Sequence, residues 1–299
     1  MRFIASLCLA AFCAFAGAPS AADQGTYPQT EEELDAAYDR LNWQTNFGSY
    51  KLPRSHAVIN LRSGQALLLG GDAERYSWLS SGTEFPDTEA VLSYDSANAQ
   101  AEVYYEWRDE GYISDSDWAD IDADQLLQDY RDGTEAANDE RVENGFQPMH
   151  VVGWLESPHY DKTTHTVTYA IELKDEDGSW ANAFALRLAR KGYTEFTWVG
   201  PVGLFQVAGG RPDLLNNALA SHSFEEGHRY ADFQEGDEVA SYGIAGLVAA
   251  AMGAKFGKGL IAGLIAFVIA SKKVVIPVVL LLGAAIAKFG RRLLGGNES

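Results

Sequence analysis

The chain has 299 residues and a formal net charge of −19 at pH 7. Residues 23–238 carry a larger acid excess than the whole chain because the flanking segments are net basic, and this disfavours a nucleic-acid partner since carboxylates and phosphates repel each other. Both cysteines, Cys8 and Cys13, fall in the first 22 residues, so the rest of the chain has no thiol for disulfides, zinc ligation or cysteine catalysis.

Residues 1–22 have the layout of a secretory signal peptide. Arg2 precedes an apolar run over residues 3–15, and small residues then lead to Ala22. The run is too short for a stable membrane anchor, so we expect cleavage near Ala22 and export of the remaining chain. A retained N-terminal anchor is the alternative.

Residues 23–238 are predicted to form one acidic α+β domain, an antiparallel sheet with helices packed on it. Thr30 and Glu33 form a capping box, which predicts a helix over residues 31–41. A long acidic helix is capped by Asp122 or Asp124 and stopped by Gly145. Strands in hairpin succession, with helices grouped between them, favour the α+β class. Shorter helices are expected over 72–79 and 213–220, and strands over 49–52, 57–61, 90–94, 101–107, 149–155, 164–173, 180–188 and 194–199.

Residues 239–299 are predicted to form a hydrophobic helical tail that associates with a lipid bilayer. Three apolar runs, over 239–254, 259–270 and 274–287, are each shorter than the roughly 20 residues of a spanning helix. Lysines between the runs can lie at the interface and lengthen the effective span. The final basic cluster favours a cytoplasmic C-terminus and one transmembrane helix, although three short crossings also fit. A soluble core that includes this tail is the other alternative.

No cofactor motif and no catalytic motif stands out, and we expect no cofactor. Asp120, Asp122 and Asp124 suggest a calcium loop, but Gln125 and Arg131 stand where such a loop needs glycine and glutamate. We expect these aspartates to cap helices instead.

Two polar segments supply the candidate functional residues. We expect the first, around Pro158, to be a turn between strands, and the second follows Gly227. Histidines near carboxylates would form a metal site only if the fold brought them together. The structural alternative is that Arg229 pairs with Asp232 and that Tyr230 seals the core. The candidates are His159, Tyr160, Asp161, Arg229, Tyr230 and Asp232, and the histidines considered for a metal are His159, His222 and His228.

Short motifs follow one another in a distinctive order from about Glu84 to the C-terminus. They are Gly111-Tyr112-Ile113-Ser114-Asp115, Gly153-Trp154, Pro158-His159-Tyr160-Asp161, Thr164-His165, Glu172-Leu173, Gly227-His228-Arg229-Tyr230-Ala231-Asp232-Phe233, Asp237 and Tyr242-Gly243. With the lysine-interrupted tail, this order resembles a bacterial family of membrane-anchored proteins catalogued only as a domain of unknown function. One departure is Leu188-Ala189-Arg190, where the family has a Leu-Gly-Arg turn. The resemblance implies an exported, membrane-attached protein and supplies no catalytic residue.

The sequence thus favours a bacterial envelope protein of the inner membrane, with its main domain in the periplasm. We expect a non-enzymatic binding or interaction module, for which another envelope protein would be the partner. The alternatives are a metal-dependent hydrolase built from His159, His228 and neighbouring acids, or a small-molecule-binding domain with a pocket between sheet and helix.

Overall fold

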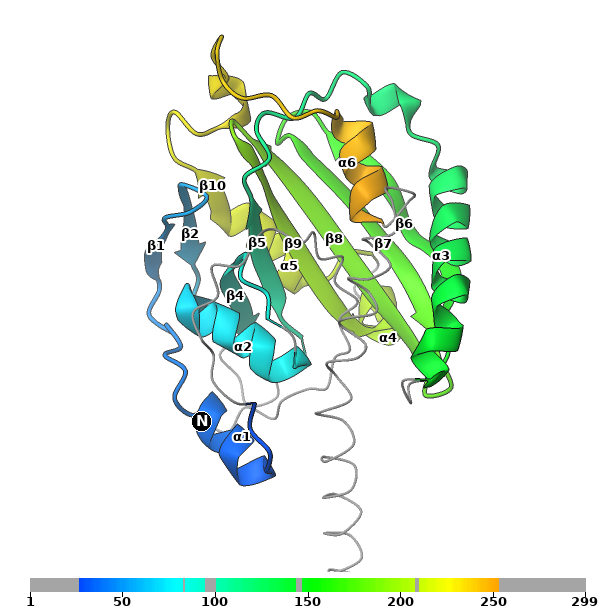
Figure 1. The fold of residues 1–299 in the computed structure, drawn as a ribbon. Helices are drawn as coiled ribbons and strands as arrows, with labels where there is room; N and C mark the ends of the chain where they lie inside the picture. The colour runs from blue at the N-terminus through cyan, green and yellow to red at the C-terminus, as the bar shows by residue number, and fades with distance from the viewer. Residues whose placement is uncertain (1–26, 83, 95–100, 144–146, 208–209, 253–299) are drawn as a thin grey trace, which may run out of the picture.

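The computed structural model describes residues 27–82, 84–94, 101–143, 147–207 and 210–252 (Figure 1). A seven-stranded antiparallel sheet has the order β3-β4-β5-β9-β8-β7-β6, and a three-stranded antiparallel sheet has the order β1-β2-β10. The strands are β1 (Gly48–Leu52), β2 (Ala57–Leu61), β3 (Gln65–Leu69), β4 (Thr88–Tyr94), β5 (Val103–Arg108), β6 (His150–Asp161), β7 (Thr166–Lys174), β8 (Ser179–Ala189), β9 (Gly192–Pro201) and β10 (His222–Phe224).

Helices cover both faces of the large sheet, and the small sheet shares one of these faces with α4 and α5. Figure 1 shows α2, α3 and α6 on the near face and α4 and α5 behind the strands. Buried side chains agree, because Phe196 and Trp198 of β9 share one core cluster with residues of the small sheet, α4 and α5. The helices are α1 (Glu31–Tyr38), α2 (Gly71–Ser81), α3 (Ala123–Glu143), α4 (Val202–Val207), α5 (Asp213–Ser221) and α6 (Ile244–Ala251), with short 3-10 turns η1 (Trp118–Asp120) and η2 (Tyr230–Asp232).

The predicted α+β class is confirmed, and the eight predicted strands are all present. The sequence interpretation missed β3, whose Ala66, Leu67 and Leu68 are all fully buried, so the strand lacks the alternation of a half-exposed one. It also placed residues 158–161 in a turn, whereas they continue β6. This edge strand accommodates Pro158 beside register shifts against β7.

The folded domain extends to residue 252, beyond the boundary expected at residue 238. Ile244, Leu247 and Val248 of α6 are fully buried and pack with Leu186 and Leu188 of β8, so this apolar run has a partner within the protein. No helix in the described part of the chain is both long enough and apolar enough to cross a membrane. Residues 1–26 and 253–299 lie outside the described residues, and the predicted signal peptide and the two later apolar runs of the predicted tail, 259–270 and 274–287, fall there.

Two distant segments pair where the chain enters α6. The backbone of Tyr112 donates to the carbonyl oxygen of Glu238 (2.8 Å) and accepts from the backbone N–H of Ala240 (2.9 Å). Gly111 has φ +78°, and a Cβ atom there would lie 3.0 Å from the Glu238 carbonyl oxygen, so only glycine fits without strain. This pairing brings the two most distinctive motifs of the sequence, around residues 111–115 and 227–243, to one end of the sheet.

Candidate functional site

A cavity of about 830 Å³ opens where the β6–β7 hairpin, β8, α5 and β10 meet. Its volume lies in the range typical of small-molecule sites. Strand register places three lining residues in one row across neighbouring strands, because Asp161 pairs with Thr166 and Thr166 pairs with Arg187. His159 and Thr168 form the next row. Alternating strand geometry therefore points these side chains to one face of the sheet, into the cavity.

The cavity is rich in cationic groups although the chain as a whole is strongly acidic. Three arginines, Arg187, Arg211 and Arg229, line it, whereas Asp161 is the single carboxylate among the described lining residues. Such a concentration of guanidinium groups in one concave site attracts anions.

Arg187 is the most deeply placed of the three arginines. Its Nη1 donates to the carbonyl oxygens of Leu219 and His222 (both 2.8 Å), and its Nε donates to Thr166 Oγ1 (3.1 Å). Burial lowers the pKa of Arg187, and the described residues give it no carboxylate within ion-pair distance. Backbone carbonyls hold the guanidinium in place, and the described hydrogen bonds of Arg187 use Nε and Nη1 but not Nη2.

Arg211 and Arg229 differ in whether a carboxylate neutralises the charge of the guanidinium group. Arg211 Nη2 donates to Glu156 Oε1 (2.5 Å) and to Thr168 Oγ1 (2.8 Å), so its charge is already paired. Arg229 is exposed at the rim and forms no ion pair with any described residue. Arg187 and Arg229 are therefore the two cations available to an anionic ligand.

Asp232 has a local structural role. Its Oδ2 accepts from the backbone N–H groups of Gly227 (2.9 Å) and Arg229 (3.0 Å), which closes the turn before η2. The expected Arg229–Asp232 ion pair is absent among the described contacts, and the backbone contact leaves the Arg229 side chain free to face the cavity.

Behind the cavity wall lies a cluster of tyrosines around His165. Tyr160 is buried and points to the opposite face of β6 from His159 and Asp161, as strand alternation requires. Its hydroxyl contacts Asp115 Oδ2 (2.7 Å) and His165 Nδ1 (3.0 Å). His165 is one of the residues that line the cavity, and the centroid of its ring lies 4.3 Å from that of the Tyr230 ring.

The histidines considered for a metal do not form a site. His228 stacks on His56, with ring centroids 3.8 Å apart, and His159 is exposed on β6. His222 is buried between Phe196 and Phe224, and burial, followed by the Arg187 charge, lowers its pKa well below 6.5. Within the described ranges no three histidine or carboxylate side chains gather closely enough to hold a metal ion.

A family model described as "Protein of unknown function (DUF2167)" matches residues 44–283. The chain belongs to this family. The match begins some way before Glu84, so it takes in the small sheet as well as the motifs that carried the resemblance.

The other comparisons are more remote. No curated protein matches the chain. Among solved structures, the solution structure of cyanobacterial PsbP (CyanoP) from Synechocystis sp. PCC 6803 is similar at 10% identity with a TM-score of 0.36. The similarity covers 61% of this chain and 94% of that one, and at this level it transfers neither activity nor ligand.

The family motifs gather around the cavity and its wall. His159, Asp161, Arg229 and Tyr230 line the cavity, whereas Tyr160 lies behind it and contacts His165. At Leu188-Ala189-Arg190, Ala189 ends β8 without a positive φ, so the backbone there does not require a glycine.

Sequence reasoning missed Arg187, Arg211 and His165. Arg187 had a detectable signal, because it continues the inward series Ala181, Ala183 and Ala185 with a charged residue. A charge on the buried face of a strand is uncommon and points to a site or to a pairing partner. Arg211 lies outside any strand or helix and gave no such signal.

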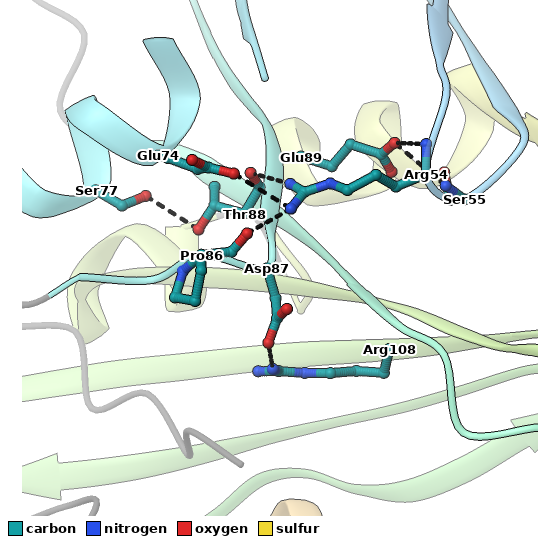
Figure 2. A network of polar contacts seen from close by, with 9 residues as sticks. All are labelled: Arg54, Ser55, Glu74, Ser77, Pro86, Asp87, Thr88, Glu89 and Arg108. Carbon is teal, nitrogen blue, oxygen red and sulfur yellow. Dashed lines mark hydrogen bonds and ion pairs between the residues drawn. The ribbon is translucent and has the colours of Figure 1, made fainter. Parts of the chain in front are cut away.

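A second group of polar contacts, shown in Figure 2, fastens the β1–β2 turn to β4 and α2. The Arg54 guanidinium donates to the Thr88 carbonyl oxygen (2.5 Å) and pairs with Glu74 (3.2 Å). Glu89 Oε1 accepts from the backbone N–H groups of Arg54 (2.6 Å) and Ser55 (3.2 Å). Because these groups bond one another, we assign them a structural role.

Two deeply buried acids lie on the face of the sheet opposite the cavity. Glu106 of β5 and Glu195 of β9 are directly paired in register and are 1% and 3% exposed. Arg108 Nη2 donates to Glu106 Oε2 (2.5 Å), and its Nη1 donates to Asp87 (Figure 2). Burial, followed by the Glu106 charge, raises the pKa of Glu195 to about 8. Two carboxyl groups beside one arginine therefore retain a proton at neutral pH.

Proposed function

We propose that this domain is a non-enzymatic binding module that holds a small anionic molecule in the cavity between the β6–β7 hairpin, α5 and β10. The observation that carries the proposal is the pair of arginines without carboxylate partners, Arg187 and Arg229, in a small-molecule-sized cavity. Guanidinium groups bind phosphate and carboxylate with two parallel hydrogen bonds, and each hydrogen bond is stronger where the site is partly buried.

We also propose that the domain faces the periplasm of a bacterial cell, exported by residues 1–22 and held at the inner membrane by residues 253–299. The support is the composition of the sequence: an apolar run behind Arg2 at one end, and lysine-separated apolar runs with a basic end at the other. Fractionation of cells that express the full chain tests this part. Recovery of the protein in the soluble cytosolic fraction would refute it.

Calorimetric titration of the full-length chain with inorganic phosphate tests the binding function. Arg229→Gln should weaken binding about fivefold, since an exposed charge-assisted hydrogen bond contributes about 1 kcal/mol. Arg187→Lys keeps the charge but loses the planar fork, and we expect a loss of about tenfold. Arg40→Gln is the matched control, because Arg40 is an exposed arginine outside the cavity.

Two outcomes would contradict the binding function. One is the absence of phosphate binding by the wild-type chain, and the other is binding that Arg40→Gln weakens as much as Arg229→Gln does. The metal-dependent hydrolase is a weaker candidate, because the described residues offer no group of three ligands.

A further inference from the structure

The hydroxyl of Tyr160 bridges a carboxylate and an imidazole. It lies 2.7 Å from Asp115 Oδ2 and 3.0 Å from His165 Nδ1, and the tyrosine side chain is buried. A tyrosine hydroxyl has one proton, and an ionised carboxylate can only accept. Tyr160 therefore donates to Asp115, and its oxygen accepts a hydrogen bond from His165.

This direction fixes the tautomer of His165. The proton of the neutral imidazole must sit on Nδ1, so Nε2 carries the lone pair and acts as a hydrogen-bond acceptor. Burial, together with the hydrogen bond to Asp115, raises the pKa of Tyr160, so the hydroxyl keeps the proton on which this direction depends.

The position of the His165 ring is fixed as well. His165 adopts φ +48°, a backbone conformation uncommon for residues other than glycine, and its carbonyl oxygen accepts from the Leu188 backbone N–H at 2.9 Å. Tyr230 packs against the ring, and Tyr230 is itself held because its hydroxyl accepts from the Asp115 backbone N–H at 3.0 Å. Asp115 thus positions both aromatic neighbours of the histidine.

The cavity therefore combines two kinds of partner. Arg187 and Arg229, which line the cavity, only donate hydrogen bonds, whereas Asp161 and His165, which also line it, can accept them; with Nδ1 engaged by Tyr160, Nε2 is the acceptor that His165 has left. Asp161 already accepts from the Thr163 backbone N–H (2.8 Å) and from Thr164 Oγ1 (2.9 Å), but a carboxylate has further lone pairs. A simple anion without an O–H group, such as sulfate, would satisfy only the arginines.

We propose that the natural ligand carries a phosphate or carboxylate group together with at least one hydroxyl group, as a hydroxy acid or a phosphorylated sugar does. The anionic group binds Arg187 and Arg229, and the hydroxyl donates to Nε2 of His165, which Tyr160 holds in the accepting tautomer. This inference rests on the proposed anion-binding function and names the chemical class of its ligand. Tyr160 is a positioning residue in this scheme and does not touch the ligand.

Two matched probes test the hydroxyl preference. Glycerol phosphate and propyl phosphate share the phosphate and the carbon chain and differ in the hydroxyl groups. The full-length wild-type chain should bind glycerol phosphate about fivefold more tightly, the value of one hydrogen bond. The preference should disappear in His165→Asn, a substitution that tolerates the positive φ. The preference should become smaller in Tyr160→Phe, because this variant keeps the aromatic ring but lacks the hydroxyl that fixes the tautomer of His165.

Nitrogen NMR of the histidine-labelled chain near pH 8, where imidazole is largely neutral, reads the tautomer directly. Wild-type His165, assigned by comparison with His165→Asn, should carry its proton on Nδ1, and Tyr160→Phe should lose this preference. If Tyr160→Phe does not fold, the wild-type spectrum and the His165→Asn titration still decide the matter.

The failures are distinguishable. Equal binding of the two probes, or a wild-type His165 protonated on Nε2, overturns the hydroxyl proposal and leaves anion binding intact. If inorganic phosphate and both probes all fail to bind, the proposed function itself is wrong.

Discussion

Replacing Glu195 by glutamine should change how the stability of the domain depends on pH. The Glu195 pKa is raised from 4.5 to about 8, because the side chain is buried opposite Glu106. When the pKa of a group is higher in the folded state than in the unfolded chain, its bound proton stabilises the fold. This stabilisation is complete below the unfolded-state pKa and is lost as pH rises through the folded-state pKa. Across this window the folded state holds about one proton more than the unfolded chain.

The magnitude follows from that single proton. The free energy of unfolding falls by about 1.4 kcal/mol per pH unit, so about 3 kcal/mol is lost between about pH 5.5 and about pH 7.5. Glu195→Gln removes this titration and leaves Glu106 free to ionise beside Arg108. For a domain of this size we expect the Tm of the wild type to fall by roughly 5–10 °C relative to the variant over that interval.

Calorimetric melting of both chains at the two pH values measures the difference. Glu84→Gln, which changes an exposed glutamate, is the matched control and should melt in parallel with the wild type. A Tm difference between wild type and Glu195→Gln that stays the same at both pH values would refute the shared-proton interpretation.

Three further predictions concern other parts of the fold. The Arg190 guanidinium lowers the pKa of Asp237 to about 2, so Asp237→Asn should remove stability that the wild type has above about pH 4 and loses as pH falls from there through about 2; acid titration of unfolding checks this. Asp161→Asn keeps the contact with the Thr163 backbone N–H through its amide oxygen but removes the one carboxylate of the described lining, so phosphate affinity by calorimetry should rise about threefold and become more sensitive to salt. Gly111→Ala places a Cβ against the Glu238 carbonyl at a positive φ, so denaturant unfolding should show a loss of about 2 kcal/mol, whereas an alanine at Gly133 on the surface of α3 should stabilise the helix.

Much of the fold follows from the period of the hydrophobic pattern. Apolar and charged residues alternate over Tyr105-Glu106-Trp107-Arg108 of β5, and the Thr30 capping box marks the start of α1. The pattern fails where both faces of a strand are buried, as in β3, and where an apolar run finds a partner inside the domain, as in α6. Apolar residues that pack on a sheet and apolar residues that enter a bilayer look the same in a single sequence.

The site could be predicted only in part. Distinctive polar motifs drew attention to His159, Asp161, Arg229 and Tyr230, and these residues do meet at one cavity. Two other features of the site could not be predicted. Strand register brings Arg187 to the cavity, and the wall behind it depends on contacts between residues more than forty positions apart, such as Tyr160 with Asp115. Register and long-range contacts are tertiary facts that local spacing does not encode.

The most direct measurement of the central claim is a crystal structure of the full-length chain soaked with glycerol phosphate. We predict that the phosphate lies within hydrogen-bond distance of Arg187 Nη2 and the Arg229 guanidinium, with a hydroxyl group against Nε2 of His165. Phosphate density elsewhere on the surface, with this cavity empty at a saturating concentration, would contradict the assignment of the cavity as an anion-binding site.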